Sequence, residues 1–129
     1  MQISKKTQYG LRAMIFLARK FKSRKDYSLK EISKSEDIPF DFSEQILSDL
    51  EKKGLIKSKK GVYGGYKLAK NPKEINAGQI VEVLEKTTTP VDCFLCGRAK
   101  KCASRSVWTR IEKEINKILK GITLEKLIR

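Results

Sequence analysis

The three cysteines of this chain lie close together in the stretch DCFLCGRAKKC, residues 92–102. Cys93, Cys96 and Cys102 are separated by two and five residues, and the 129-residue chain contains no histidine. Clustered thiolates bind metal ions or iron–sulfur clusters, or oxidise reversibly, and the neighbouring Lys and Arg side chains favour the thiolate form. An odd number of cysteines argues against a framework of structural disulfides. The spacing therefore predicts a metal-binding or redox-active segment.

The charge of the chain predicts a polyanionic partner. The chain has 29 Lys and Arg against 15 Asp and Glu, which leaves a formal net charge of +14. The excess basic side chains would repel one another in a compact protein with no polyanion beside it. Nucleic acid is the first candidate partner, an anionic membrane surface is the second, and a generally lysine-rich proteome is the alternative explanation. The longest apolar run, residues 13–18, is too short to span a membrane, so we expect a cytoplasmic protein with reduced thiols.

The polar residues form no pattern that is typical of an enzyme. The sequence has no histidine to act as a base, no glycine loop of the P-loop or Rossmann type, and no obvious pair of carboxylates. We therefore predict a binding protein and not an enzyme.

Residues 5–21 are predicted to form a first helix, and residues 29–35 a short second one. Apolar side chains wrap around most of the first helix, so it must be covered on nearly all sides, in part by a second subunit. Ser28 and Glu31 have the spacing of a capping box that starts the second helix.

A third helix is predicted to run to Lys53. Asp41 and Glu44 have the spacing of another capping box, and Gly54 is placed to end the helix. Two short helices joined by a tight turn are typical of a helix-turn-helix, in which the second helix enters the major groove of DNA. The inward face holds Phe42, Ile46, Leu47 and Leu50, and the opposite face, a candidate DNA-reading surface or simply a solvated one, holds Ser43, Glu44, Gln45, Ser48, Asp49 and Lys52.

A β-hairpin is predicted to follow. Residues 55–59 and 66–69 alternate in polarity, and the stretch KGVYGG between them supplies glycines for the tip. A helix-turn-helix followed by a hairpin is a winged helix. Residues 52–70 contain seven lysines and no acidic residue, whereas a solvated face normally mixes charges, so we expect this region to contact phosphates.

The rest of the chain predicts two more helices. Asn76 and Gln79 form a capping box that starts a helix to about residue 85, and Thr123 caps a final turn. Between them, a helix over residues 104–120 carries an apolar stripe made of Trp108, Ile111, Ile115, Ile118 and Ile122. The predicted fold is mainly α, with residues 1–85 as a winged helix-turn-helix domain with a two-stranded wing, residues 86–103 as a cysteine-containing sensor loop, and residues 104–129 as a long dimerisation helix with a C-terminal turn.

Together these motifs resemble the Rrf-type winged-helix transcription regulators, the family that includes IscR, NsrR and CymR. The matching segments are ISKKTQYGLRAM at 3–14, SEQIL at 43–47, GLIKSKKGVYGGYKLA at 54–69, AGQIVEVLE at 77–85, and the cysteines ahead of Trp108 and TLEKL. They cover nearly the whole chain in the family's order. The resemblance implies a homodimer, in which the stripe from Trp108 to Ile122 pairs across a two-fold axis, and two winged helices that bind a palindromic site on double-stranded DNA. Packing within one chain is the alternative for the stripe.

The resemblance also implies which residues contact DNA. Asp41, Glu44 and Gln45 match helix positions that meet base edges, where a glutamate accepts from cytosine and a glutamine pairs with adenine. Lys60 stands where relatives often have an arginine that enters the minor groove. A lysine there weakens the readout of groove width, because it lacks the planar guanidinium of arginine. The other expected contacts are Lys5, Lys6 and Lys59 to phosphates, and Ser43, Ser48 and Tyr63 on the third helix and the wing.

Family members that sense through the cysteine segment hold an iron–sulfur cluster, so the resemblance implies a 2Fe–2S or 4Fe–4S cluster on Cys93, Cys96 and Cys102. The first cysteine interval is shorter than in the IscR branch, but C-x2-C is itself a common cluster spacing. Arg105 stands where the IscR branch has a histidine ligand, and Gln8 where the NsrR branch has a carboxylate. Asp92, Ser104, Ser106, an external thiol or solvent remain as candidates for the fourth ligand. An incompletely ligated cluster would suit a repressor or other regulator that senses redox state, nitric oxide or iron–sulfur status.

Other roles for the thiols stay open from the residues alone. Three thiolates and one oxygen could bind zinc, and Cys93 with Cys96 could form a reversible disulfide beside Arg98, Lys100 and Lys101 as a cluster-free thiol switch. In each case we expect the state of the segment to set its packing against the dimer helix, and so the separation of the two recognition helices. For the whole protein, the alternative is an architectural nucleic-acid-binding protein without sequence preference.

Overall fold

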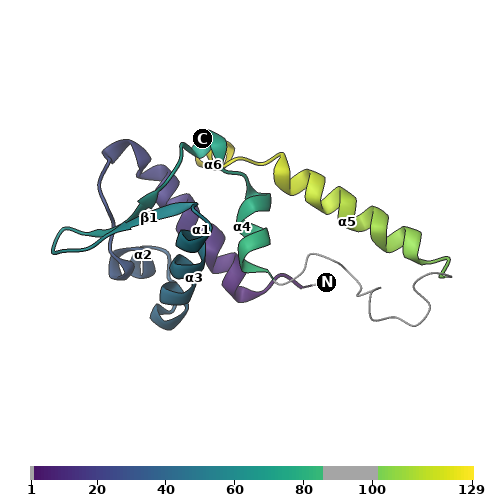
Figure 1. The fold of residues 1–129 in the computed structure, drawn as a ribbon, viewed down its shortest axis with the longest axis horizontal. Helices are drawn as coiled ribbons and strands as arrows, with labels where there is room; N and C mark the ends of the chain where they lie inside the picture. Colours follow the sequence, from purple (N-terminus) through teal and green to yellow (C-terminus); the bar gives the residue numbers. More distant parts are fainter. Residues whose placement is uncertain (1, 86–101) are drawn as a thin grey trace.

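The computed structural model of the chain describes residues 2–85 and 102–129, which form helices and one two-stranded antiparallel sheet (Figure 1). No helix in these two ranges is long and apolar enough to cross a membrane. The α-helices are α1 (Lys5–Arg19), α2 (Leu29–Ser35), α3 (Phe40–Lys52), α4 (Ala77–Leu84), α5 (Arg105–Lys120) and α6 (Leu124–Ile128), the strands are β1 (Ile56–Lys59) and β2 (Gly65–Leu68), and the short 3-10 helices are η1 (Phe21–Ser23) and η2 (Pro72–Glu74).

The winged helix-turn-helix predicted from the sequence is confirmed. Helices α2 and α3 are followed by the hairpin of β1 and β2, whose register pairs Ile56 with Leu68 and Lys59 with Gly65. Gly54 ends α3 in a left-handed conformation (φ 76°), which a residue without a Cβ adopts easily. The predicted long C-terminal helix is also present as α5, which extends from the body on the side opposite to the wing (Figure 1).

Three of the predicted helix starts are confirmed by their caps. The hydroxyl of Ser28 accepts the backbone N–H of Glu31 (3.1 Å), and that of Thr123 caps α6. At α4 the capping box is complete, because the Asn76 side chain accepts from the Gln79 backbone (2.9 Å) and the Gln79 side chain accepts from the Asn76 backbone (3.0 Å). Each of these caps satisfies backbone N–H groups that the first turn of a helix leaves without partners.

The predicted capping box of Asp41 and Glu44 is wrong. Helix α3 begins directly after Pro39, which occupies the cap position and offers no side-chain hydrogen bond. Its carbonyl accepts the backbone N–H groups of Phe42 (3.0 Å) and Ser43 (3.1 Å). The fixed φ of proline (−54° here) places the chain for a helix start earlier than expected, so Asp41 lies inside the first turn, where its charge still complements the helix dipole.

Helix α1 lies at the centre of the core. Met14 and Leu17 are fully buried, and Gly10 lies so close to α4 that a Cβ there would stand 2.0 Å from a terminal carbon of Leu84. The last helix returns to this body, because Leu124 is 0 % exposed and its backbone N–H donates to the carbonyl of Ile75 (2.9 Å). Helix α6 is therefore part of the packed core, although it follows the long helix in the chain.

The wing is fastened to the body by the chain just before α2. Tyr27 and Tyr66 exchange backbone hydrogen bonds of 2.9 and 2.7 Å, which form an isolated β-bridge. A Cβ at Gly65 would lie 2.3 Å from the Tyr27 carbonyl oxygen, so the close approach requires glycine. This bridge sets the direction in which the hairpin leaves the body.

Candidate nucleic-acid interface

The exposed face of α3 carries most of the residues that were expected to read DNA. Asp41, Glu44 and Gln45 are exposed, and Ser48 is half-buried. Ser43, by contrast, is 2 % exposed, and its hydroxyl donates to the Pro39 carbonyl (3.2 Å). The prediction that Ser43 lies on the outward face is therefore wrong, because its position three and four residues before the buried Ile46 and Leu47 puts it on the inward side.

Two aromatic residues at the start of α3 are more exposed than the sequence indicated. Phe42 was expected in the core but is 43 % exposed, and Phe40 is 54 % exposed. Phe42 shares its face with Ile46 but lies in the first turn of the helix, where the Tyr9 ring packs against it edge-on at a centroid distance of 5.5 Å. The Arg12 guanidinium lies 5.5 Å from the Tyr9 ring on its own helix, and the sequence had not singled out this aromatic and basic group.

A polar chain joins the start of α1 to the exposed face of α3. The Lys6 ammonium donates to one carboxylate oxygen of Asp49 (2.6 Å), and the Gln45 amide donates to the other (3.0 Å). The hydrogen bond from Lys6 is the main reason that the pKa of Asp49 lies below its ordinary value. Lys6 is therefore oriented by α3, and the Gln45 side chain is oriented by the same carboxylate.

A second polar group ties the start of α1 to the end of α4. The Glu85 carboxylate accepts from the Ser4 backbone N–H (3.2 Å), the Ser4 hydroxyl (3.1 Å) and the Thr7 hydroxyl. Desolvation raises the pKa of Glu85, but the hydrogen bonds from Thr7 and Ser4 lower it by more, so the net shift is downward. Ser4 also caps α1, so this carboxylate holds the turn from which Lys5 and Lys6 project.

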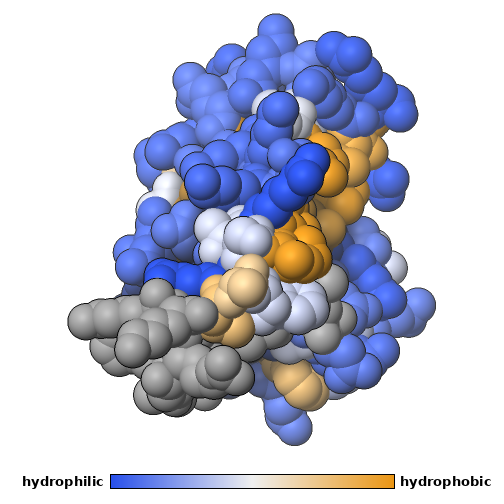
Figure 2. Space-filling view, turned by 90° about the vertical axis from the view of Figure 1, so that its right-hand side faces the viewer, coloured by the Kyte–Doolittle hydropathy of each residue, from blue (hydrophilic) through white to orange (hydrophobic). Residues whose placement is uncertain are grey.

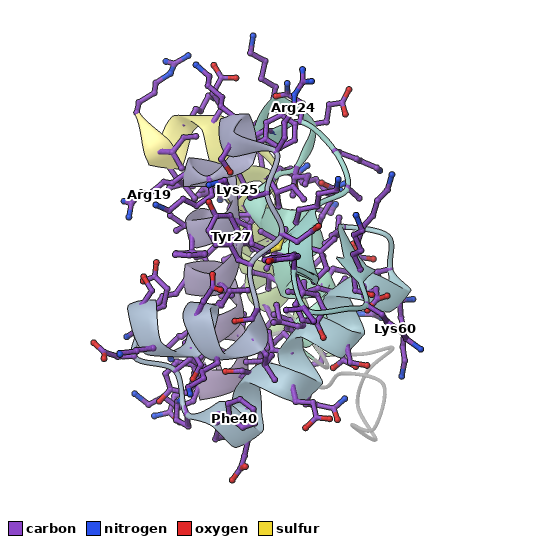
Figure 3. The ribbon with its side chains drawn as sticks, turned by 90° about the vertical axis from the view of Figure 1, so that its left-hand side faces the viewer. Arg19, Arg24, Lys25, Tyr27, Phe40 and Lys60 are labelled. Carbon is purple, nitrogen blue, oxygen red and sulfur yellow. The ribbon has the colours of Figure 1, made fainter. Side chains whose placement is uncertain are left out.

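The wing presents its lysines to solvent. Lys59 and Lys60 are exposed, and Val62 and Tyr63 at the tip are 95 % and 93 % exposed. Figure 3 shows Lys60 of the wing and Phe40 of α3 on one side of the molecule, the side remote from α5. The residues expected to contact DNA from the helix and from the wing therefore face the same way.

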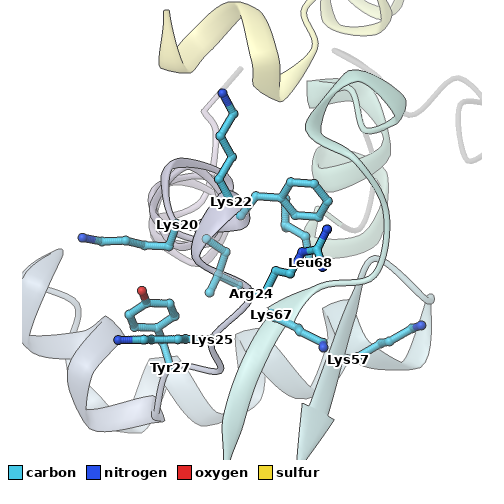
Figure 4. Close-up of a pocket in the computed structure, with 10 residues that line it drawn as sticks. Lys20, Lys22, Arg24, Lys25, Tyr27, Lys57, Lys67 and Leu68 are labelled. Atoms are coloured by element: carbon cyan, nitrogen blue, oxygen red, sulfur yellow. The ribbon is translucent and has the colours of Figure 1, made fainter.

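A basic cluster that the sequence did not bring together joins two lysines of the wing strands to the turn after α1. It surrounds an open pocket of about 460 Å³ between the end of α1 and the hairpin (Figure 4). Apolar side chains, among them Leu17, Tyr27 and Leu68, form part of the lining, and no acidic residue does. The basic cluster consists of Lys20, Lys22, Arg24, Lys25, Lys57 and Lys67.

Of the three cysteines, only Cys102 lies within the described residues; Cys93 and Cys96 lie outside them. The Cys102 thiol is free and partly exposed, and its sulfur is 2.9 Å from the Ser104 hydroxyl. The hydrogen bond from Ser104 lowers the pKa of Cys102, which favours the thiolate. Within residues 2–85 and 102–129 no three Cys, Asp or Glu side chains come together as a metal site. Gln8, a position considered for a fourth ligand, is exposed and donates its amide to the Ile3 carbonyl (2.8 Å).

The apolar stripe of helix α5 is only partly covered by the described part of the chain. None of its residues is buried, and Ile118 is 60 % exposed. Trp108, Ile111 and Ile115 are only half-buried, as is Ile122 just beyond the helix. Figure 2 shows apolar side chains gathered on this side of the molecule. An amphipathic helix that buries no residue needs a partner surface.

These elements define a class of protein: a winged-helix transcription regulator with an exposed helix, a basic wing and a long apolar-striped helix. The chain belongs to the Rrf2 family, because the family model described as "Iron-dependent Transcriptional regulator" matches residues 3–129. The resemblance noted in the sequence is thereby confirmed.

Individual relatives agree with this assignment over most of their length. The HTH-type transcriptional regulator CymR of Bacillus subtilis is 39 % identical over 127 residues, which cover 98 % of this chain and 89 % of CymR. The solved structure of CymR, described as the global cysteine regulator of B. subtilis, superposes with a TM-score of 0.86 at 38 % identity, covering 99 % of this chain and 96 % of that one. The structure of T. potens IscR superposes with a TM-score of 0.83 at 34 % identity, covering 99 % of this chain and 86 % of that one.

Proposed function

We propose that this regulator is a homodimer that binds a palindromic DNA operator and that an iron–sulfur cluster on Cys93, Cys96 and Cys102 sets its DNA affinity. The observation that carries the DNA-binding part is the shared orientation of the exposed face of α3 and the lysine-bearing wing. The dimer and the cluster rest on separate observations, so each has its own experiment.

On the DNA side, the proposed contacts come from three elements. Glu44 and Gln45 on α3 read base edges, since their carboxylate and amide groups match cytosine and adenine. The wing contributes Lys59 and Lys60, and Tyr63 lies at its tip. Asp41, Ser48 and Lys5 complete the proposed contact set. Lys6 contributes charge from a position fixed by Asp49.

Selection of bound sequences from a random duplex pool, followed by competition binding, tests this part. We expect an enriched palindrome and a preference of ~10³ or more over random DNA. The matched variants are Gln45→Ala, which should relax sequence preference, and Lys59→Gln, which should weaken binding to all sequences alike. A ratio near one for the wild-type protein would instead identify an architectural DNA-binding protein.

The proposed dimer pairs the stripe of α5 with that of a second copy. Its support is the lack of any buried residue on α5 in a helix that carries Trp108 and four isoleucines along or just beyond it. Sedimentation equilibrium should give twice the mass of the chain. Ile115→Glu should produce monomers, whereas Lys113→Glu on the opposite face of the helix should not; a monomeric wild-type protein would contradict the proposal.

The proposed cluster would be held by the three cysteine thiolates. Cys102 suits this role, because it is partly exposed and the hydrogen bond from the Ser104 hydroxyl lowers its pKa. A lower pKa favours the thiolate, which is the form that binds metal. When bound, such a cluster supplies a centre that reacts with oxidants and nitric oxide and is lost when iron is scarce. The Ser104 hydroxyl lies 2.9 Å from the Cys102 sulfur, and Arg105 at the start of α5 links the cysteine segment to the proposed dimer helix.

Anaerobic purification tests the cluster. We expect bound iron and acid-labile sulfide, visible absorbance, and loss of all three in Cys102→Ala with the far-UV circular dichroism retained. Operator affinity should then differ between the loaded and cluster-free protein. The absence of iron, sulfide and absorbance from the anaerobic wild-type protein would remove the cluster from the proposal.

A thiol switch without a cluster is the second candidate function. A relative, CymR of Staphylococcus aureus, has been solved in an oxidized form, with a TM-score of 0.82 and 32 % identity. The hydrogen bond from Ser104 lowers the pKa of Cys102, and the resulting thiolate character also suits oxidation. In metal-free protein, peroxide should change operator affinity reversibly with dithiothreitol, and Cys102→Ser should abolish the change; a peroxide-insensitive metal-free protein would exclude this candidate.

A further inference from the structure

Within residues 2–85 and 102–129, the basic cluster beside the wing takes part in no ion pair. All six side chains are exposed, and they belong to two separate parts of the chain, the turn after α1 and the two strands of the wing (Figure 4). Like charges repel one another, and a bound anion would offset the repulsion among these six groups.

Two local features of the basic cluster are unfavourable for the isolated chain. Lys57 and Lys67 stand directly opposite each other across the hairpin, an arrangement in which like charges destabilise a sheet. Arg24 has a left-handed backbone (φ 57°), a conformation that residues other than glycine rarely adopt. Features that cost stability often persist at binding sites, which makes this cluster a candidate site.

The position of the basic cluster favours DNA over a small ligand. It includes two residues of the wing strands, and Arg24 and Lys25 lie on the same side of the molecule as Lys60 and Phe40 (Figure 3). A site for a small anion would enclose its charged groups, whereas these six ammonium and guanidinium groups are exposed around a pocket mouth. Exposed cations of one sign suit a row of phosphates, which a duplex presents at about one charge per 1.7 Å.

We propose that the basic cluster binds the phosphate backbone of the DNA that flanks the operator, beyond the groove contacted by the wing. The inference rests on the proposed DNA-binding function and extends it. Each phosphate contact adds about 0.9 to the steepness of the plot of log affinity against log salt concentration. A tenfold increase in salt therefore weakens that contact about eightfold. The protein therefore covers a longer stretch of DNA than α3 and the wing tip alone require.

The test compares two triple variants of equal charge. The cluster variant is Lys22→Gln, Arg24→Gln and Lys25→Gln, which leaves the wing unchanged. The control variant is Lys73→Gln, Lys113→Gln and Lys117→Gln, at exposed positions on η2 and α5. Affinity is measured over a salt series on two duplexes, one that ends at the edges of the operator and one extended on each side by about half a helical turn, ~5 base pairs.

We expect the wild-type protein and the control variant to bind the long duplex more tightly and with the steeper salt slope. The cluster variant should lose about 2 to 3 from that slope on the long duplex and little on the short one. Equal slopes for the cluster and control variants on the long duplex would overturn the inference and leave an acidic protein as the partner class for this surface. Equal losses on both duplexes would overturn it too, because the contact would then lie within the operator.

A further variant separates charge from folding. Arg24→Gly removes the guanidinium and suits the left-handed backbone, so its melting temperature should not fall while the salt slope on the long duplex falls by about 1. An unchanged slope in a stable Arg24→Gly protein would contradict the role given to Arg24. Failure of the wild-type protein to prefer any operator would be a different result, since it refutes the proposed function before the variants are compared.

Discussion

Replacing Glu85 by alanine is expected to destabilise the folded protein by about 2 kcal/mol. The carboxylate accepts hydrogen bonds from the Ser4 backbone, the Ser4 hydroxyl and the Thr7 hydroxyl. A bond to a charged acceptor contributes roughly 1.5 to 3 kcal/mol when buried, and the half-exposed position of Glu85 reduces the total because water replaces part of it. Thr7, only 2 % exposed, keeps the Ser4 hydroxyl at 3.1 Å as a partner, which limits the loss further.

Two more variants grade the effect. Glu85→Gln keeps an acceptor oxygen and loses the charge, so we expect a loss of roughly 1 kcal/mol. Glu82→Ala on the same helix is the control, because Glu82 is exposed and makes no hydrogen bond or ion pair to the described residues. Urea unfolding followed by circular dichroism at one protein concentration gives these differences, and 2 kcal/mol corresponds to roughly 6 to 10 °C in melting temperature.

The effect should also depend on pH. The pKa of Glu85 is lowered in the folded protein from an ordinary value of 4.5, so its carboxylate stabilises the fold above that pH. This stability is lost as the pH falls through the folded pKa, and the gap between wild type and Glu85→Gln should close there. A gap that persists at low pH, or a Glu85→Ala protein within 0.5 kcal/mol of Glu82→Ala, a margin of about the measurement error, would refute the reasoning. Operator affinity should fall with stability, since the same hydrogen bonds hold the turn that carries Lys5 and Lys6.

Three other substitutions test the remaining contacts. Asp49→Asn should change stability by less than about 1 kcal/mol, because the ion pair with Lys6 is partly exposed, but it should lower the preference for operator over random DNA in competition binding; an unchanged preference would contradict the positioning role. Gly65→Ala should destabilise by roughly 2 kcal/mol or more in urea unfolding, since its Cβ would lie 2.3 Å from a carbonyl oxygen, whereas Gly54→Ala, with open space around it, should lose only about 1 kcal/mol; equal losses would count against the wing bridge. Asn76→Ala should lose about 1 kcal/mol through the capping box of α4, and a loss below 0.3 kcal/mol would show that the cap adds little.

Much of the fold could be predicted because its signals are local. The caps at Ser28, Asn76 and Thr123 depend on residues three positions apart, and the hairpin depends on alternation and on glycines at its tip. The one cap that failed did so for a local reason too, because Pro39 started α3 before Asp41. Ser43 was expected on the outward face because its side chain is polar. Its spacing of three residues from the buried Ile46 instead places it on the inward face.

The candidate DNA surface divides in the same way. The exposed Glu44 and Gln45 and the wing lysines were evident from the sequence, since one-sided charge and helix-turn-helix spacing are properties of short segments. The basic cluster was not, because Lys22 and Lys25 are separated from Lys57 and Lys67 by the whole helix-turn-helix, and they become neighbours only when the wing pairs with Tyr27.

The sequence by itself determined the class of protein, the approximate positions of its helices and wing, the one-sided charge and the apolar stripe of α5. Only the tertiary structure decided that Glu85 holds the start of α1, that Asp49 orients Lys6 and Gln45, and that a basic cluster adjoins the wing. The physical reason is range: periodicity and capping act within a few residues, whereas these hydrogen bonds and charge clusters join side chains that are brought together by the packing of α1 against α3, α4 and the wing.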